Sequence, residues 1–204
     1  MSFELVVATK NKKKLQEIRD ILSGLGLKIT SIVDYPNLPR IIENGKTFKS
    51  NAAKKALKIG SHLHKLTMGE DSGLCVNALA GRPGIYSSRF SGKNKSDAQN
   101  NAKLLRLLEG LPMSKRRSHY TCAVALADGK RLIAVVEGKC FGIIARELKG
   151  SQGFGYDPLF LIPRYKKTFG QLGEGIKHKM SHRYKALKQI RKIIEKYIEK
   201  HPCS

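Results

Sequence analysis

The amino-acid sequence predicts an α/β fold from two observations. First, an apolar run at residues 3–8 leads through a polar turn into a segment whose apolar residues recur at helical spacing. Second, apolar runs at residues 120–127 and 132–137 flank Asp128-Gly129, a dipeptide typical of a short hairpin between antiparallel strands. A strand that leads directly into a helix is typical of α/β architecture, and the hairpin adds antiparallel strands to it.

The N-terminal part of the chain begins with a strand and a helix. Residues 3–8 are predicted to form a buried strand, and residues 11–23 a helix that ends at Gly24. Residues 27–33 are predicted to form a second strand. Residues 35–42 contain prolines and are predicted to form a loop.

The middle of the chain carries two amphipathic segments. Residues 47–63 show an apolar stripe with lysines on the opposite face, which predicts a helix that ends near Gly60. Residues 81–84 are predicted to form a turn. Residues 97–108 have apolar positions at helical spacing and are predicted to form a further helix.

The C-terminal part follows the hairpin. Residues 141–146 are predicted to add another strand, and Ser181 is a candidate N-cap for the final helix. The sequence shows no internal repeat and no long linker. We therefore expect one domain over residues 1–204, with a core of its own, that can be divided into two lobes.

Three features of the sequence indicate the cellular compartment. No segment resembles a signal peptide, and no apolar run is long enough to cross a bilayer, so we expect a cytoplasmic protein without a membrane partner. The cysteines are widely spaced and predict neither a zinc site nor a disulfide framework. They are Cys75, Cys122, Cys140 and Cys203.

The net charge of +23 favours a polyanionic partner, which could be a nucleotide, a nucleic acid or an anionic membrane. The basic residues are spread along the whole chain. Proteins that read nucleic acids more often cluster arginines and interleave them with aromatic residues. A solvated basic surface explains the charge equally well when it is taken alone.

Two adjacent carboxylates, Glu70 and Asp71, lie beside the apolar residues that start at Leu74. Carboxylates near a core lose hydration, and that cost is usually offset by pairing or by a metal ion. The pattern favours a Mg²⁺ that bridges these acids to a phosphate-rich substrate, although a carboxylate that caps a turn is the alternative for Asp71. Glu43 could complete the shell of the cation, but taken alone it more simply favours a helix start.

The turn at residues 9–14 lies where the first strand meets the first helix. Free backbone N–H groups and the helix dipole favour an anion there, so this basic turn could hold phosphates. A P-loop is excluded because its Gly-Lys-Ser/Thr signature is missing. An exposed basic turn is the simpler alternative for this segment alone.

Two further segments could recognise a base. The glycine-rich loop at residues 150–158 contains Phe154 and Tyr156, and an aromatic ring there offers a stacking face. Lys177, His182 and Arg183 gather hydrogen-bond donors near the start of the last helix. For the loop, the alternative is an ordinary turn whose two aromatic residues pack in the core. For the second segment, the alternative is that Ser181 caps the helix and that His182 and Arg183 are surface residues.

Six different short motifs are distributed along nearly the whole chain. They are Thr9-x-Asn11-x-x-Lys14-x-x-Glu17, Glu43-x-Gly45-x-Thr47-Phe48 with Asn51-Ala52, Asp71-Ser72-Gly73-Leu74, Gly81-x-Pro83-Gly84-x-Tyr86-Ser87, Gly153-Phe154-Gly155-Tyr156-Asp157-Pro158 and Ser181-His182-Arg183. In this order the motifs resemble the inosine triphosphate pyrophosphatase family, whose members remove non-standard purine nucleotides from the nucleotide pool. Each motif alone is weak, whereas the whole set in register is specific.

The resemblance implies a long, twisted, mixed sheet flanked by helices, with two lobes and an active site in a central cleft. It also implies an enzyme, a nucleoside triphosphate pyrophosphatase that hydrolyses an acid anhydride. Members of the family cleave ITP, dITP or XTP between the α and β phosphates, with Mg²⁺ as cofactor, to a monophosphate and pyrophosphate. They typically form homodimers.

The resemblance further implies roles for individual residues. Asp71 would accept a proton from the attacking water and contact Mg²⁺, which Glu43 would help to hold. Phe154 would lie against the purine, with Lys177, His182 and Arg183 near its edge. The residues that would grip the triphosphate are Thr9, Lys10, Asn11, Lys12, Lys13 and Lys14. The residues that would bind the nucleotide are Ser72, Phe154, Gly155, Tyr156, Asp157, Lys177, His182 and Arg183.

The chain departs from the family pattern at three positions. Lys10 stands where glycine is usual, which affects how closely the backbone can wrap a phosphate. Glu70 stands where many members have aspartate, so the acidic character is kept. Ser50 stands where glutamate is common, which bears on metal affinity or on dimer contacts.

Two alternative functions are left open by the sequence. The charge of +23 also fits a basic nucleic-acid-binding protein, whose affinity would fall steeply with salt. The sequence shows no basic stripe interleaved with aromatic residues, so this alternative ranks below the enzyme. A related pyrophosphatase that acts on other modified nucleotides is the second alternative.

Overall fold

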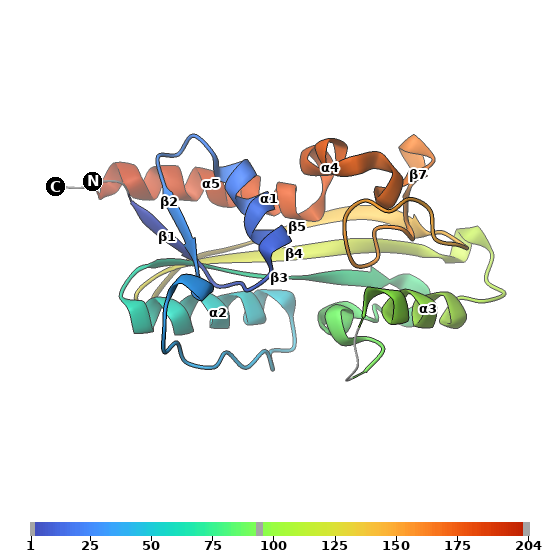
Figure 1. Cartoon of the computed structure of the whole chain (residues 1–204), viewed down its shortest axis with the longest axis horizontal. Helices are drawn as coiled ribbons and strands as arrows, with labels where there is room; N and C mark the ends of the chain where they lie inside the picture. Colours follow the sequence, from blue (N-terminus) through green and yellow to red (C-terminus); the bar gives the residue numbers. More distant parts are fainter. Residues whose placement is uncertain (1–2, 93–95, 202–204) are drawn as a thin grey trace. The chain divides into compact units, whose positions relative to one another are not determined.

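The computed structural model describes residues 3–92 and 96–201. Within these residues, seven strands form one sheet in the order β2-β1-β3-β4-β5-β6-β7 (Figure 1). β1 pairs in parallel with β2 and β3, whereas β6 pairs antiparallel with β5 and β7, so the sheet is mixed. The strands are β1 (Glu4–Val7), β2 (Lys28–Ser31), β3 (Leu66–Val76), β4 (Arg117–Asp128), β5 (Arg131–Ile144), β6 (Phe160–Ile162) and β7 (Lys167–Thr168).

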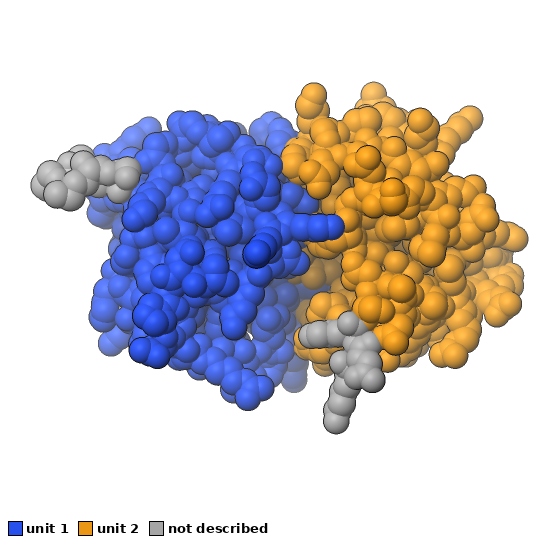
Figure 2. Space-filling view, viewed as in Figure 1, with its two compact units in different colours: residues 1–71, 122–138, 183–204 blue, residues 72–121, 139–182 orange. Residues whose placement is uncertain are grey.

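Helices flank this sheet, which confirms the expected α/β fold with a mixed sheet. The α-helices are α1 (Lys12–Leu22), α2 (Phe48–Leu63), α3 (Asp97–Leu107), α4 (Phe169–Met180) and α5 (His182–Lys200). The chain divides into two compact units, each assembled from separate segments (Figure 2). Unit 1 comprises residues 1–71, 122–138 and 183–204, and unit 2 comprises residues 72–121 and 139–182.

Unit 1 has apolar layers on both faces of its strands. α1 and α5 lie on one face and α2 on the other (Figure 1). Ile18 of α1 and Leu187 of α5 belong to one buried cluster that also contains Leu5 of β1. On the opposite face, the small residues Ala52 and Ala56 of α2 pack against alanines of β4. These two layers hold the strands that carry the candidate site.

α2 approaches β3 unusually closely at Gly69. A Cβ atom at this glycine would lie 2.1 Å from the backbone oxygen of Ala52 and 2.7 Å from the backbone nitrogen of Ala56. Any side chain here would therefore push the helix away from the strand. Glycine at position 69 lets the following residues of β3 meet the side chains of α2.

Unit 2 is built around an aromatic core. Tyr120 of β4 lies 4.5 Å from Phe160 of β6, and Phe160 lies 5.3 Å from Phe169 of α4, measured between ring centroids. Leu104 of α3 and Leu74 of β3 belong to the same buried cluster. This core supports the loop at residues 150–158 that the sequence marked as a candidate binding loop.

The predicted elements agree with the structure where the pattern is long. The helices at residues 11–23, 47–63 and 97–108 and the final helix are confirmed, as is the hairpin at Asp128-Gly129. The second strand is shorter than expected, because residues 32–34 form a 3₁₀ turn that Ser31 caps.

Two other expectations about elements were wrong or incomplete. α2 does not end near Gly60 but continues to Leu63, and His64 then ends it in the left-handed conformation with φ 53°. Residues 141–146 do not form a separate strand, since β5 continues without a break to Ile144. No described helix combines the length and apolar character needed to cross a membrane.

Candidate active site

The two adjacent carboxylates lie inside β3, not at a turn beside the core. Glu70 is 2% exposed and Asp71 is 7% exposed. Successive side chains of a strand point to opposite faces of the sheet. Glu70 accordingly contacts residues of α1 and α5, whereas Asp71 contacts residues of α2. One strand thus presents a buried carboxylate to each face.

The Asp71 carboxylate is held by two side chains of α2. The Asn51 Nδ2 group donates to Asp71 Oδ2 at 3.1 Å, and Lys55 Nζ lies 3.4 Å from Asp71 Oδ1. Asn51 is itself oriented by the backbone N–H of Gly45, which donates to Asn51 Oδ1 at 2.8 Å. These contacts fix both oxygens of the carboxylate.

Burial controls the protonation of Asp71. Loss of hydration raises the pKa of this carboxyl, and the opposing effects of Lys55 and the Asn51 hydrogen bond do not cancel it. The pKa of Asp71 is therefore raised above the ordinary aspartate value. A raised pKa makes the carboxylate a better proton acceptor, which suits a general base.

Lys55 is a site residue that the sequence reasoning missed. Its Nζ lies 2.9 Å from Glu43 Oε2 and 3.4 Å from Asp71 Oδ1, and it donates to the backbone oxygen of Glu70 at 3.1 Å. Its position in the sequence could have identified it, because Lys55 lies on the buried face of α2 together with Ala52 and Ala56. A lysine on the buried face of a helix usually has a charged partner.

Electrostatics keeps the Lys55 ammonium charged. Burial alone would lower the pKa of Lys55, but the carboxylates of Asp71 and Glu43 outweigh that effect and raise the pKa. Lys55 therefore places a fixed positive charge between Asp71 and Glu43.

On the other face of β3, Glu70 joins a buried ionic network. Glu70 Oε2 lies 3.0 Å from Lys14 Nζ, and Glu70 Oε1 lies 3.2 Å from a guanidinium nitrogen of Arg183. Arg183 also pairs with Glu17, and the Cys122 thiol donates to Glu70 Oε1 at 3.3 Å. Burial would lower the pKa of Arg183, but Glu70 and Glu17 raise it, so the guanidinium is charged.

Arg183 is 1% exposed, and its guanidinium lies between two carboxylates. The resemblance had implied that it lies near the edge of a purine. In the structure, Arg183 fixes Glu70, and Glu70 in turn fixes the Lys14 ammonium. Arg183 is the shared partner of Glu17 and Glu70, and the sequence alone did not reveal this pairing.

The candidate phosphate turn lies at the start of α1. Asn11 caps this helix by accepting the backbone N–H of Lys14 at 3.1 Å, and the Thr9 hydroxyl accepts the backbone N–H of Asn11 at 3.1 Å. Lys10, Asn11, Lys12 and Lys13 are exposed, whereas Lys14 is half-buried. Lys14 contacts the carboxylate network through Glu70.

The donor set around Asp71 fits a hard cation. Two carboxylates, Glu43 and Asp71, converge on the positive charge of Lys55. Mg²⁺ usually takes one or two protein carboxylates and fills its remaining positions with water and substrate phosphates. Among residues 3–92 and 96–201, no group of three His, Cys, Asp or Glu side chains is arranged to hold a metal by itself. A Mg²⁺ held by Glu43 and Asp71 would complete its coordination with water and substrate phosphates.

In unit 2, the glycine-rich loop is organised by Asp157. Asp157 Oδ2 accepts the backbone N–H of Phe154 at 2.9 Å and pairs with Lys177 Nζ at 2.7 Å. The Lys177 ammonium lies 4.5 Å from the centre of the Phe154 ring. The structure thus brings Lys177 of α4 to Phe154 and Asp157 of the loop, from which it is distant in the sequence.

The other candidate nucleotide residues of unit 2 are also held by specific contacts. The His182 ring stacks on Tyr120 with 4.6 Å between centroids. The Tyr156 hydroxyl donates to the backbone oxygen of Ser87 at 2.8 Å, and the Gly155 oxygen accepts from Asn101 at 3.0 Å. Ser72 lies half-buried in β3.

Replacing Lys55 with methionine should raise the pKa of Asp71 further. Lys55 is the strongest charge that opposes the effect of burial, so without it the carboxyl keeps its proton to higher pH. A ¹³C carboxyl titration of the metal-free protein measures this shift. Lys54, on the exposed side of α2, provides a matched control as Lys54→Met. An Asp71 pKa that is unchanged or lowered in Lys55→Met would contradict this account of the site.

Comparisons with known proteins identify the family. The model of the Ham1 family matches residues 5–193. The dITP/XTP pyrophosphatase of Desulforamulus reducens is 47% identical over 193 residues, which cover 95% of this chain and 96% of that protein. The dITP/XTP pyrophosphatase of Shouchella clausii is 44% identical over 94% of this chain and 96% of its own.

Solved structures agree with the sequence comparison. A HAM1 protein from Coxiella burnetii superposes with a TM-score of 0.88 at 36% identity, over 95% of this chain and 99% of that chain. The Ham1 protein of Staphylococcus aureus gives a TM-score of 0.86 at 34% identity over the same shares of the two chains. These matches confirm the resemblance found in the sequence motifs, and the chain belongs to the Ham1 family.

Proposed function

We propose that this protein hydrolyses non-standard purine nucleoside triphosphates, namely dITP, ITP and XTP, to the monophosphate and pyrophosphate. The observation that carries the proposal is the buried Asp71 carboxylate, which Asn51 and Lys55 hold with its pKa raised. The names of the relatives, dITP/XTP pyrophosphatase, support the substrate class. This is also the enzyme that the sequence motifs predicted.

In this mechanism, Asp71 is the general base. An oxygen of its carboxylate takes a proton from a water molecule while that water attacks the α phosphorus of the substrate. The bond between the α phosphorus and the oxygen that bridges to the β phosphate breaks, and pyrophosphate leaves with the electron pair of that bond. Asn51 and Lys55 keep the carboxylate oriented throughout.

Positive charge stabilises the departing pyrophosphate. Lys14 is fixed by Glu70 at 3.0 Å, and Glu70 is fixed by the buried Arg183. A preorganised ammonium stabilises developing negative charge better than a mobile lysine, because no reorganisation is needed during the reaction. Although Lys14 pairs with Glu70, its charge also acts on Asp71 and opposes the rise in the pKa of that carboxyl, so the two groups can serve one substrate. We therefore assign Lys14 to the triphosphate and Arg183 to positioning. Thr9, Lys10, Asn11, Lys12 and Lys13 complete the basic turn that would contact the phosphates.

Glu43 and Asp71 are the residues that would hold Mg²⁺. When bound, this ion offsets the negative charge of the phosphates and so reduces their repulsion of the attacking oxygen. The exposed carboxylate of Glu43, whose side chain is 40% exposed, can turn toward a ligand at little cost. The buried Asp71 cannot move in this way.

The residues of unit 2 are proposed to recognise the nucleoside. Phe154 offers a ring face to a purine, and Asp157 and Lys177 fix the loop that carries it. His182, stacked on Tyr120, offers ring nitrogens to an oxygen on the base. Ser72, Gly155 and Tyr156 remain proposed contacts. Dependence on Mg²⁺ and a homodimeric state remain predictions from the resemblance, and a cytoplasmic location remains a prediction from the sequence.

The products of ITP hydrolysis test this function. We expect the purified protein with Mg²⁺ to convert ITP to IMP and pyrophosphate in equal amounts, as followed by ³¹P NMR. XTP should give the corresponding monophosphate and pyrophosphate. Formation of IDP and orthophosphate would place the cleavage at the wrong bond and refute the mechanism. Failure to turn over either nucleotide would refute the substrate class.

A further inference from the structure

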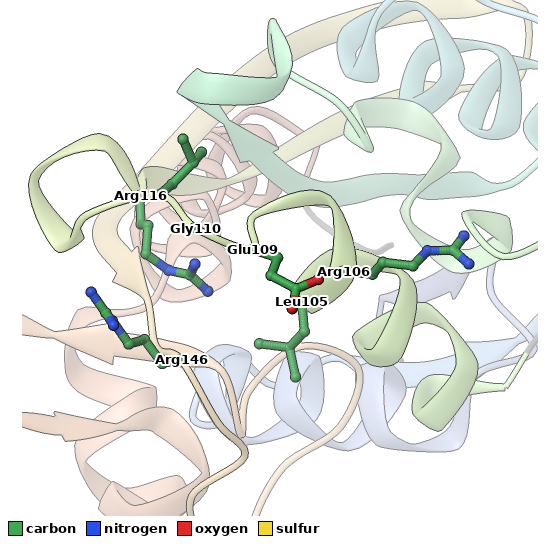
Figure 3. A pocket seen from close by; sticks show the side chains of 7 residues that line it. Leu105, Arg106, Glu109, Gly110, Arg116 and Arg146 are labelled. Carbon is green, nitrogen blue, oxygen red and sulfur yellow. The ribbon is translucent and has the colours of Figure 1, made fainter.

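A second cationic site lies within unit 2, in a cavity of about 340 Å³ (Figure 3). The cavity lies where α3 ends, between the residues that precede β4 and those that follow β5. Its lining has three arginines and one glutamate and therefore carries net positive charge. The lining residues are Leu105, Arg106, Glu109, Gly110, Leu111, Arg116 and Arg146.

Arg116 is the central feature of this cavity. It is only 3% exposed, and its guanidinium donates to the backbone oxygens of Leu108, Ile144 and Ala145 at 2.6, 2.8 and 2.8 Å. A guanidinium carries five N–H groups, so these carbonyls do not use its full hydrogen-bonding capacity. The carbonyls hold the group rigidly but do not neutralise its charge.

The charge of Arg116 has no carboxylate partner in the described part of the chain. Neither Arg116 nor Arg146 forms an ion pair there, although buried charges are usually paired. Arg146 adds a second positive charge on the same side of the cavity (Figure 3). Burial and, to a smaller extent, Arg146 lower the pKa of Arg116, which shows that the charged form is penalised at this position.

We propose that this cavity binds a small phosphate-class oxyanion, such as orthophosphate or pyrophosphate, between Arg116 and Arg146. A rigid guanidinium suits the bidentate recognition of such an anion, and a bound anion would neutralise the unpaired buried charge. Ligand cavities span about 300–1,000 Å³, so this volume accommodates a small ligand. The lining contains no aromatic ring on which a base could stack. The proposal does not depend on the function assigned to unit 1.

The Arg116 side chain itself provides the readout. Its Nε–H group donates to the buried Ile144 oxygen, so its ¹H–¹⁵N resonance should be protected from exchange with solvent. We would titrate the full-length, metal-free protein with pyrophosphate at constant ionic strength and follow this resonance. A saturable shift is expected. Because the signal belongs to Arg116, binding of pyrophosphate in unit 1 does not contribute to the result.

Three variants of the lining give matched comparisons. Arg146→Gln should weaken binding about tenfold, the usual effect of losing one charge-assisted contact. Arg106→Gln removes the same charge but should change affinity less than about twofold, since the Arg106 guanidinium points away from the other two arginines (Figure 3). Glu109→Gln should strengthen binding, because it removes the negative charge from the lining. Arg146 and Arg106 are exposed, so their variants should fold.

The outcomes separate the proposal from a general effect of basic surface charge. A saturable shift that Arg146→Gln weakens and Arg106→Gln leaves in place supports the site. A parallel titration with orthophosphate shows how many phosphate groups the site holds, and either result supports the proposal. A response to both anions indicates a site for one phosphate group. A response to pyrophosphate alone indicates a site for two phosphate groups. The absence of a saturable shift overturns the proposal, as does equal weakening by Arg146→Gln and Arg106→Gln.

Discussion

Replacing Asp71 with asparagine is expected to reduce kcat for ITP hydrolysis by about 10²–10⁴-fold, the range that proton transfer by a positioned group contributes. The amide has nearly the same shape as the carboxylate but cannot accept a proton from water. Lys55 can still contact the side-chain oxygen, and Glu43 still balances its charge, so the fold should persist. Steady-state kinetics with ITP and Mg²⁺ measure the loss, and circular dichroism checks the fold.

An exposed aspartate of unit 1 provides the control for this experiment. Asp20 lies on the surface of α1, where its carboxylate accepts a hydrogen bond from Gln16 at 2.7 Å. Asp20→Asn changes the net charge by the same amount and should leave kcat within about twofold, since surface changes away from a site have small effects. If Asp71→Asn retained kcat within a factor of about ten, Asp71 would not be the general base.

Replacing Arg183 with methionine is expected to lower the free energy of unfolding by about 3–5 kcal/mol, the usual cost of removing one partner of a buried ion pair. Methionine fills much of the same volume, but it leaves the carboxylates of Glu17 and Glu70 buried without their shared cation. Lys14 remains near Glu70 and offsets part of the loss. Urea denaturation of both proteins at pH 7 measures the difference.

Lys188 is the matched control for the stability prediction. It is a cation on the same helix, but it is exposed, so Lys188→Met should change the unfolding free energy by less than about 0.5 kcal/mol. A second variant tests the cause: adding Glu17→Gln and Glu70→Gln to Arg183→Met should restore part of the loss, because the two carboxylates that Arg183 bridged are then neutral. A loss below about 1 kcal/mol in Arg183→Met would show that the network is not a major source of stability.

The sequence predicted the regular elements well where a periodic pattern ran over many residues. α1, α2, α3 and α5 have long apolar stripes, and the hairpin between β4 and β5 has a defining dipeptide. β3 was missed because Gly69, Glu70, Asp71 and Ser72 interrupt its apolar pattern. These polar residues are buried by tertiary partners, which a local pattern does not contain. α4 was missed because glycines, including Gly173 with φ 73°, break its helical signal.

The candidate site was predicted in part. Two neighbouring acids in an apolar context were enough to mark Asp71 as a candidate, and a basic turn between the first strand and the first helix was enough to mark residues 9–14. The sequence did not indicate that Glu70 and Asp71 serve opposite faces of the sheet, because that requires knowing that they lie in a strand. The roles of Lys55 and Glu17 also depend on partners distant in sequence, so only the fold reveals them.

The ratio of kcat/KM for ITP to kcat/KM for GTP tests the central claim most directly. The two substrates share the triphosphate and differ at the purine, so the ratio reports whether the site selects non-standard bases. We predict a preference for ITP of at least about fivefold, because each buried polar group left unpaired by the wrong base costs about 1–3 kcal/mol. Equal values of kcat/KM for ITP and GTP would contradict the proposed function.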